Sequence, residues 1–103
     1  MKKPTFKING KTYEMKEPKA RAWRLITEFE ENKKEISNAE YIDKHAEIIA
    51  QFFDLSVDEI LDGMDISDVI KTFYDCYKYI STLLYSKMEK LGNVESGEMT
   101  KSN

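Results

Sequence analysis

The sequence predicts a mainly α-helical fold of the α+β class, in which an N-terminal β-hairpin precedes four helices and the last helix is long. Three observations support this prediction. Asn9-Gly10 separates two short alternating segments, which is typical of a tight hairpin. Helix-capping residues recur between apolar stretches of helical spacing. From Met64 to Leu91 there is no Pro or Gly, and apolar residues recur every three or four positions.

Length and composition predict one domain, residues 1–91, with one modest core. The chain has 103 residues, of which 41% are hydrophobic and 34% charged, as in soluble globular proteins. No apolar run reaches the length of a membrane span, and the N-terminal segment MKKPTFK lacks the apolar stretch of a signal peptide. We therefore expect a cytoplasmic protein. Its single Cys76 cannot form an internal disulfide, and we expect a buried thiol.

The charge is unevenly distributed along the chain. Residues 1–24 contain eight Lys or Arg and two Glu, and residues 54–75 contain seven Asp or Glu and one Lys, so their net charges are +6 and −6. The whole chain has a net charge of −3, which argues against nucleic acid as the main partner. The asymmetry either pairs two surfaces within one fold or aligns subunits head to tail.

The hairpin is predicted over residues 4–16. A two-residue turn at Asn9-Gly10 puts Ile8 opposite Lys11 and Phe6 opposite Tyr13. One face then carries the apolar side chains Phe6, Ile8, Tyr13 and Met15, and the other face carries Thr5, Lys7, Thr12 and Glu14. Because an isolated hairpin is only marginally stable, the apolar face is expected to pack on helices or on another subunit.

Three shorter helices are predicted next, over about residues 18–34, 39–53 and 56–62. In the first, Pro18 lies in the first turn and the buried positions are Ala22, Trp23, Ile26 and Phe29. Ser37-Asn38 caps the second helix, in which His45 is expected to be partly buried or exposed. Ser56 and Glu59 form a capping box for the third helix, with Ile60 and Leu61 facing inward and Gly63 at its end.

The long helix is predicted over residues 65–91, with Asp65 as N-cap and Gly92 as a left-handed stop. Its main apolar row is Ile66, Ile70, Phe73, Tyr77, Ile80, Leu84, Met88 and Leu91, and a second row is Val69, Cys76 and Leu83. At 1.5 Å per residue the helix is about 39 Å long, so one end is expected to project past the core. The polar residues 92–103 are expected to form a disordered tail.

The residues of known catalytic and metal-binding patterns are missing. There is no glycine-rich phosphate loop, no Cys–His pair at useful spacing and no nucleophile elbow, so we expect no enzyme and no cofactor. The acidic run from Asp58 to Asp68 fails the EF-hand pattern because Ile60 stands at a ligand position. His45 has no second histidine or cysteine nearby, so no metal site is predicted.

A short resemblance suggests one alternative function. Residues 49–61 resemble the late helices of phage-repressor-type helix-turn-helix domains. Such a domain needs an earlier recognition helix with polar and basic residues, whereas the segment from Glu28 to Glu47 is acidic. A small DNA-associated regulator therefore remains only an alternative, as does a generic adaptor that binds a helical partner.

A second resemblance covers residues 4–91. It rests on the hairpin TFKINGKTYEM at 5–15, the segment Arg21-Ala-Trp-Arg24, the acidic helical middle, the segment SVDEILDGMD at 56–65 and the long last helix. In this order of elements the chain resembles the small tail assembly chaperones of long-tailed bacteriophages and prophages, especially those of Gram-positive hosts.

This resemblance implies a non-enzymatic role in virion morphogenesis. Such chaperones bind the tape measure protein and keep it soluble while tail tube subunits, a second possible partner, polymerise around it. They act in the host cytoplasm and are absent from the mature virion. Many are made in two forms by translational frameshifting, and residues 92–103 lie where such a junction would fall.

Partner-binding residues are predicted from charge and exposed apolar area. For a homo-oligomer, we expect the hairpin and first helix of one subunit to meet the acidic segment 54–75 of the next. For the helical client, we expect contacts on the last helix, where Tyr79 and Tyr85 add amphipathic area. The predicted residues are Lys7, Arg21, Arg24, Asp62, Asp65, Asp68, Tyr74, Tyr77, Leu84 and Met88.

Overall fold

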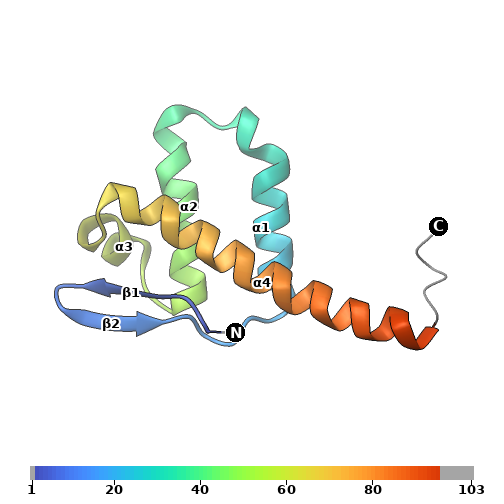
Figure 1. Ribbon diagram of the computed structural model, residues 1–103. Coiled ribbons are helices and arrows are strands. Elements are labelled where there is room, and N and C mark those ends of the chain that lie inside the picture. The colour runs from blue at the N-terminus through green and yellow to red at the C-terminus, as the bar shows by residue number, and fades with distance from the viewer. Residues whose placement is uncertain (1, 96–103) are drawn as a thin grey trace.

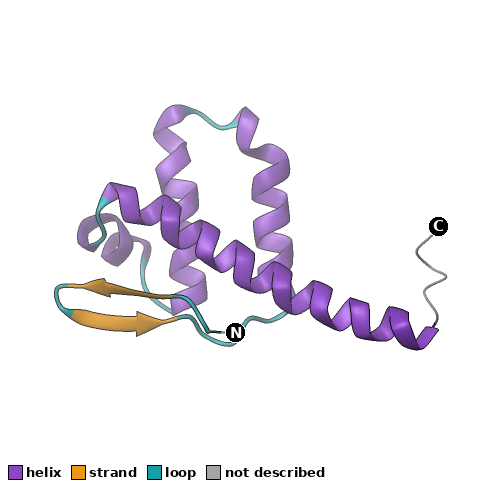
Figure 2. Ribbon diagram, in the orientation of Figure 1, coloured by secondary structure: helices purple, strands orange, loops and turns teal. Residues whose placement is uncertain are grey.

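The computed structural model describes the backbone of residues 2–95 and the side chains of residues 2–89. An antiparallel hairpin is followed by four α-helices, which confirms the predicted fold class (Figures 1 and 2). The elements are β1 (Thr5–Ile8), β2 (Lys11–Glu14), α1 (Ala20–Asn32), the 3-10 turn η1 (Lys33–Glu35), α2 (Asn38–Phe53), α3 (Val57–Gly63) and α4 (Ile66–Glu95).

The hairpin has the predicted register, with Phe6 opposite Tyr13 and Ile8 opposite Lys11. Asn9 and Gly10 have φ angles of 51° and 82°, as a type I′ turn requires. The apolar face is covered and Met15 is fully buried, whereas Thr5, Lys7, Thr12 and Glu14 are exposed. The alternation of side chains therefore determined which face of the hairpin packs on the helices.

Helix α1 begins at Ala20, so the prediction that Pro18 lies in its first turn is wrong. Lys19 is the N-cap residue, and its side chain makes no capping hydrogen bond. The backbone N–H of Lys16 donates to the carbonyl of Phe52 at 2.9 Å, which ties the preceding segment to the end of α2. Proline also disfavours the helical conformation of the residue before it, so the chain stays non-helical through Glu17.

Both serine caps are confirmed. Ser37 and Glu40 form a capping box at the start of α2, and Ser56 and Glu59 form another at the start of α3. In α3 only Ile60 is buried, and Leu61 is exposed, so the prediction that both face inward is wrong. A two-turn helix that rests on one side against the core buries only one narrow row of side chains.

The core lies where α4 crosses α1 and α2 (Figure 1). The buried row of α4 contains Val69, Phe73, Cys76 and Ile80. Val69 and Cys76 come from the predicted second row, and Phe73 and Ile80 come from the predicted main row. Two residues of the predicted main row, Ile66 and Met88, are instead 72% and 52% exposed. Ile66 is the first residue of α4, and Met88 is near the end of the residues whose side chains are described; α4 extends past α1 on this C-terminal side (Figure 1).

Helix α4 continues through Gly92 to Glu95, so Gly92 does not end the helix as predicted. A glycine in a helix interior costs only about 1 kcal/mol relative to alanine, and flanking helical residues can offset this. The predicted projection of one end is confirmed, because α4 extends well past α1 (Figure 1). Of the predicted tail, residues 96–103 lie outside the described residues.

His45 is fully buried, so the expectation of a partly buried or exposed side chain is wrong. Its ring lies 4.6 Å, between centroids, from each of the rings of Phe29, Tyr41 and Phe73. Nδ1 lies 2.8 Å from the carbonyl oxygen of Tyr41. Burial lowers the pKa of His45, which therefore contributes to the core as a neutral ring.

Candidate partner-binding surface

The exposed part of α4 has two sides of opposite character. Helical periodicity puts Lys71, Asp75, Lys78, Thr82 and Glu89 on one side, next to the buried row. The other side, which we call the apolar flank, consists of Ile66, Ile70, Tyr74, Tyr77, Leu84, Tyr85 and Met88. Most of their spacings are three, four or seven residues, as on one helical face, and the adjacent residues Leu84 and Tyr85 lie at its two edges. The helix therefore offers a second apolar row in addition to its core row.

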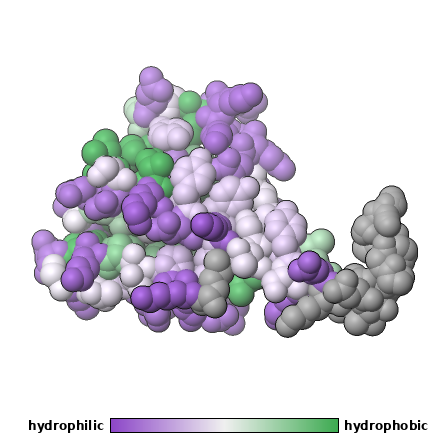
Figure 3. All heavy atoms as spheres, in the orientation of Figure 1, coloured by the Kyte–Doolittle hydropathy of each residue, from purple (hydrophilic) through white to green (hydrophobic). Residues whose placement is uncertain are grey.

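The apolar flank is long and partly open to solvent. Tyr74 and Tyr85 are 40% and 55% exposed, and Ile70, Tyr77 and Leu84 are half-buried. From Ile66 to Met88 the flank is about 33 Å long at 1.5 Å per residue. Figure 3 shows a pale band of intermediate hydropathy along α4 between strongly polar regions. An apolar strip of this length on a small protein is typical of an interaction surface.

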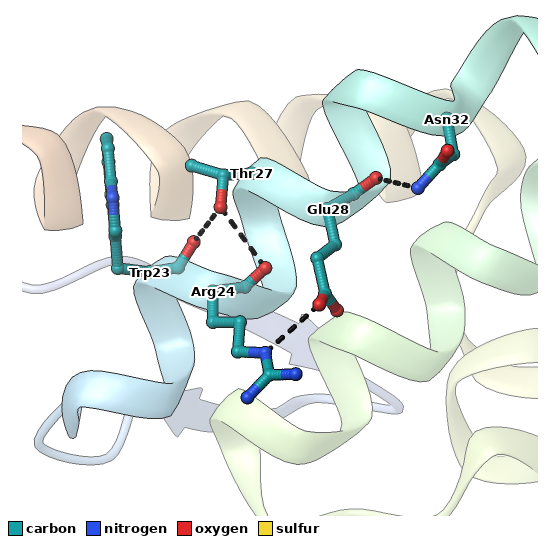
Figure 4. A network of polar contacts seen from close by, with 5 residues as sticks. All are labelled: Trp23, Arg24, Thr27, Glu28 and Asn32. Atoms are coloured by element: carbon teal, nitrogen blue, oxygen red, sulfur yellow. Dashed lines mark hydrogen bonds and ion pairs between the residues drawn. The ribbon is translucent and has the colours of Figure 1, made fainter.

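Trp23 of α1 extends the apolar flank near its projecting end. Its ring meets that of Tyr85 edge to face, with centroids 6.0 Å apart and an interplanar angle of 83°. Thr27 Oγ1 donates to the Trp23 carbonyl oxygen at 2.9 Å (Figure 4). In the same figure, Arg24 and Glu28 point away from Trp23 and Thr27. The sequence assigned Trp23 to the core, but the structure leaves it half-buried at the edge of this surface.

An ion pair borders the flank near Tyr74. Lys33 Nζ lies 2.9 Å from Glu30 Oε1 at the end of α1. The hydrogen bond to Glu30 raises the pKa of Lys33, and the nearby Tyr74 contributes in the same direction. The rings of Tyr74 and Tyr77 lie 6.3 Å apart, between centroids. This part of the flank therefore combines aromatic area with a charged border, as protein interfaces do.

Residues 1–96 match the protein family described as phage tail chaperone protein. The chain belongs to the phage tail chaperone family. No curated protein and no solved structure gives a significant match. A tail chaperone family implies binding to tail proteins, which makes the apolar flank of α4 the candidate contact surface. Within the described residues, no helix of this tail chaperone is long and apolar enough to cross a membrane.

The predicted basic contact residues of this tail chaperone lie on two elements, the hairpin and α1. Lys7 is on the outer face of the hairpin, and Arg21 borders a shallow depression with Gln51 and Phe52. Arg24 is paired with Glu28 at 3.0 Å on the exposed side of α1. Arg21 and Arg24 are one turn apart on α1 and share an exposed face, whereas Lys7 lies on the hairpin, so the structure groups two of the three predicted basic residues.

The predicted acidic residues gather near the junction of α3 and α4. Asp62 lines an open cleft together with Lys11 and Tyr13 of the hairpin. Asp65 precedes α4, and its carbonyl accepts the N–H groups of Asp68 and Val69. All three carboxylates are exposed. Acidic residues of α3 and Lys11 of the hairpin thus line the same cleft within one chain.

The predicted client residues Tyr74, Tyr77, Leu84 and Met88 all lie on the apolar flank. Tyr79 does not, because it is buried beside Ile80 on the core side of α4. Ile66, at the start of α4, was assigned to the core by its spacing and instead begins the flank. Among residues 2–89, no group of three or more His, Cys, Asp or Glu side chains is placed to hold a metal ion.

Proposed function

We propose that this tail chaperone binds the tape measure protein during tail assembly and keeps it soluble without catalysing a reaction. The observation that supports the proposal is the apolar flank of α4, which is exposed in a protein of a tail chaperone family. We further propose that it acts in the cytoplasm of the bacterial host and is not retained in the virion.

The chemistry of the flank suits a helical client. An amphipathic helix binds through apolar side chains spaced three and four residues apart, which match a strip of the same periodicity. Tyr74, Tyr77 and Tyr85 offer large rings with a polar tip, so they tolerate both apolar contact and water. Covering the apolar strip of a long helical chain removes the surface through which it would aggregate.

The test is co-expression with the tape measure protein encoded in the same genome, measuring the soluble fraction of the client. We expect the wild type to keep the client soluble in a complex that size-exclusion chromatography with light scattering can weigh. The double variant Tyr74→Ser/Met88→Ser should lower the soluble fraction several-fold, because both side chains are exposed on the flank.

The matched control is Lys71→Ser/Glu89→Ser, which removes two exposed side chains from the polar side of α4. It should leave client solubility unchanged. A client that stays insoluble with the wild type would refute tape measure binding. Equal effects of the two double variants would show that the flank is not the site.

A further inference from the structure

The outer edge of β1 presents backbone groups that the hairpin itself does not use. Within the described residues the sheet has only two strands, so each strand has one outer edge (Figure 2). The N–H of Met15 donates to the carbonyl of Pro4 at 3.0 Å, which makes these two residues a bonded pair of the ladder. Bonded and non-bonded pairs alternate in an antiparallel ladder, so Thr5 and Lys7 turn their N–H and C=O groups away from β2.

The two edges of the hairpin differ in how far they are covered. Just beyond β2, the N–H of Lys16 donates to the carbonyl of Phe52 at 2.9 Å, so this edge is tied to the end of α2. Thr5 and Lys7 are exposed, and within residues 2–95 neither backbone bonds to a residue outside the hairpin. A row of unpaired N–H and C=O groups on an exposed edge is a template for another extended chain.

A depression of about 310 Å³ lies at the N-terminal end of the β1 edge, between the start of the chain and the polar side of α4. It is lined by Lys2, Lys3, Pro4, Thr5, Asp75, Lys78 and Tyr79. None of these lining residues belongs to β2, so the depression lies on the open side of β1. A chain that pairs with the edge of β1 would therefore continue into it.

The depression is positively charged. Two of its three lysines, Lys2 and Lys78, are exposed and form no ion pair with a side chain of residues 2–89. The third, Lys3, is paired with a glutamate at 3.1 Å. The one lining carboxylate, that of Asp75, lies 3.0 Å from Lys71 Nζ and is already neutralised. An occupant with acidic side chains therefore complements this end of the edge.

We propose that the open edge of β1 binds an extended acidic segment of a partner protein as a third strand. The backbone of that segment pairs with the N–H and C=O groups of Thr5 and Lys7, which requires an extended chain and not a helix. Its acidic side chains face Lys7 on the outer face of the sheet and Lys2 and Lys78 in the depression. This contact goes beyond the proposed function, because the helical client is assigned to the apolar flank, a separate surface.

The probe is a short synthetic peptide of alternating Glu and Thr, which carries its carboxylates on one face when extended. It is titrated to about 5 mM into the full chain, and amide hydrogen exchange is measured by NMR. Exchange at Thr5 and Lys7 should slow at least about fivefold, because both N–H groups become bonded. Exchange at Thr12 and Glu14, on the opposite edge, should not change. The same peptide with Lys in place of Glu should not bind.

One pair of variants tests the charges. Lys2→Glu/Lys78→Glu should weaken peptide binding at least about tenfold at about 150 mM NaCl. Lys19→Glu/Lys87→Glu makes the same change in net charge at exposed positions that do not line the depression. This control should change the affinity less than about threefold, because distant charges are screened at that salt concentration.

A second pair tests backbone pairing. Thr5→Pro removes an outward N–H from β1 without breaking a bond of the ladder, and should weaken peptide binding at least about fivefold. Thr12→Pro makes the matching change on the outer edge of β2 and should leave binding unchanged. Circular dichroism checks that both variants fold, and the exchange measurement on the wild type does not depend on them.

Unchanged exchange at Thr5 and Lys7 at the highest peptide concentration would overturn the proposal, as would equal binding of the Lys peptide. Protection at Thr12 and Glu14 instead would place the partner on β2 and would also overturn it. If Thr5→Pro bound like the wild type, charge alone would hold the peptide and no third strand would form. Client solubility is measured separately, so failure of the edge contact would leave the proposed function intact.

Discussion

Ile8 of the hairpin packs directly on Gly63 at the end of α3. A Cβ placed on Gly63 would lie 2.5 Å from Ile8 Cγ2 and 3.2 Å from Ile8 Cδ1. Among the described glycines, only Gly10 has a positive φ angle, so Gly63 is not required by its backbone conformation. Its role is to let the hairpin approach α3 more closely than a side chain would allow.

Gly63→Ala is therefore expected to destabilise the protein by about 1–2 kcal/mol, because the added methyl group forces Ile8 to move. Urea unfolding measures this change in free energy. Relative to the wild type, the variant should also show faster amide hydrogen exchange, and the increase should be larger in β1 and β2 than in α2, because the hairpin loses its docking contact.

The same substitution should have the opposite effect once Ile8 is shortened. In an Ile8→Ala background, Gly63→Ala should stabilise by up to about 1 kcal/mol, because alanine favours the helical conformation. A double-mutant cycle compares the two effects. If Gly63→Ala costs the same in both backgrounds, the Ile8–Gly63 contact does not determine how the hairpin docks.

Asp54 occupies a left-handed conformation at the end of α2, with φ 58° and ψ 49°. A non-glycine residue is strained there, so Asp54→Gly is expected to raise the free energy of unfolding by about 0.5–1 kcal/mol. Gln51→Gly, on the exposed side of the same helix, is the control and should lower it by about 1 kcal/mol. Urea unfolding at neutral pH would contradict the prediction if Asp54→Gly were destabilising.

His45 should make stability depend on pH. Its pKa is lowered by burial, and Glu30 and Lys33 act on it in opposite directions. As pH falls below about 6.5, the unfolded chain takes up a proton that the folded chain rejects. Stability should fall through this window, by at most about 1.4 kcal/mol per pH unit, until the folded-state pKa is reached. Urea unfolding at several pH values between about 7.5 and 5.5 measures this loss.

The control for this prediction is His45→Gln, which replaces the only histidine with a neutral side chain. The variant is expected to be less stable at pH 7.5, because its side chain packs less well among Phe29, Tyr41 and Phe73. Its stability should nevertheless vary much less with pH over the same window. If the free energy of unfolding of the variant fell equally steeply with pH, the pH dependence would be due to carboxylates instead.

Cys76 should be protected from thiol reagents in the folded protein. It is buried, and burial raises its pKa to about 12. At pH 8 the folded chain should react with a disulfide reagent at least about a hundredfold more slowly than the unfolded chain. As a control, Thr82→Cys introduces an exposed thiol on α4. Labelling of this variant should show a fast phase from Cys at position 82 and a slow phase from Cys76. Fast labelling of Cys76 in the native wild type would show that the core around it opens readily.

Local patterns determined the hairpin and the helix starts. Asn9-Gly10 accepts positive φ angles, and side-chain alternation then determined which face is apolar. The two capping boxes, at Ser37 and Ser56, depend on residues three apart and form in the structure as predicted. These features could be predicted because every interaction they need lies within a few residues along the chain.

The start of α1 and the environment of His45 could not be predicted in this way. Lys16 bonds to Phe52, which is distant in sequence, and this contact keeps the segment before Ala20 out of the helix. His45 is buried because α1 and α4 place Phe29 and Phe73 around it. Both results depend on which segments become neighbours in three dimensions.

The long helix also combines features that follow from local sequence with features that depend on tertiary contacts. The sequence by itself determined that 66–91 is helical and apolar on more than one side, since periodicity is a property of local geometry. Only the tertiary structure decided that Val69, Phe73 and Cys76 enter the core while Ile66 and Met88 remain exposed. The physical reason is that α1 and α2 cover only part of α4, and hydrophobic burial depends on which surface another element covers.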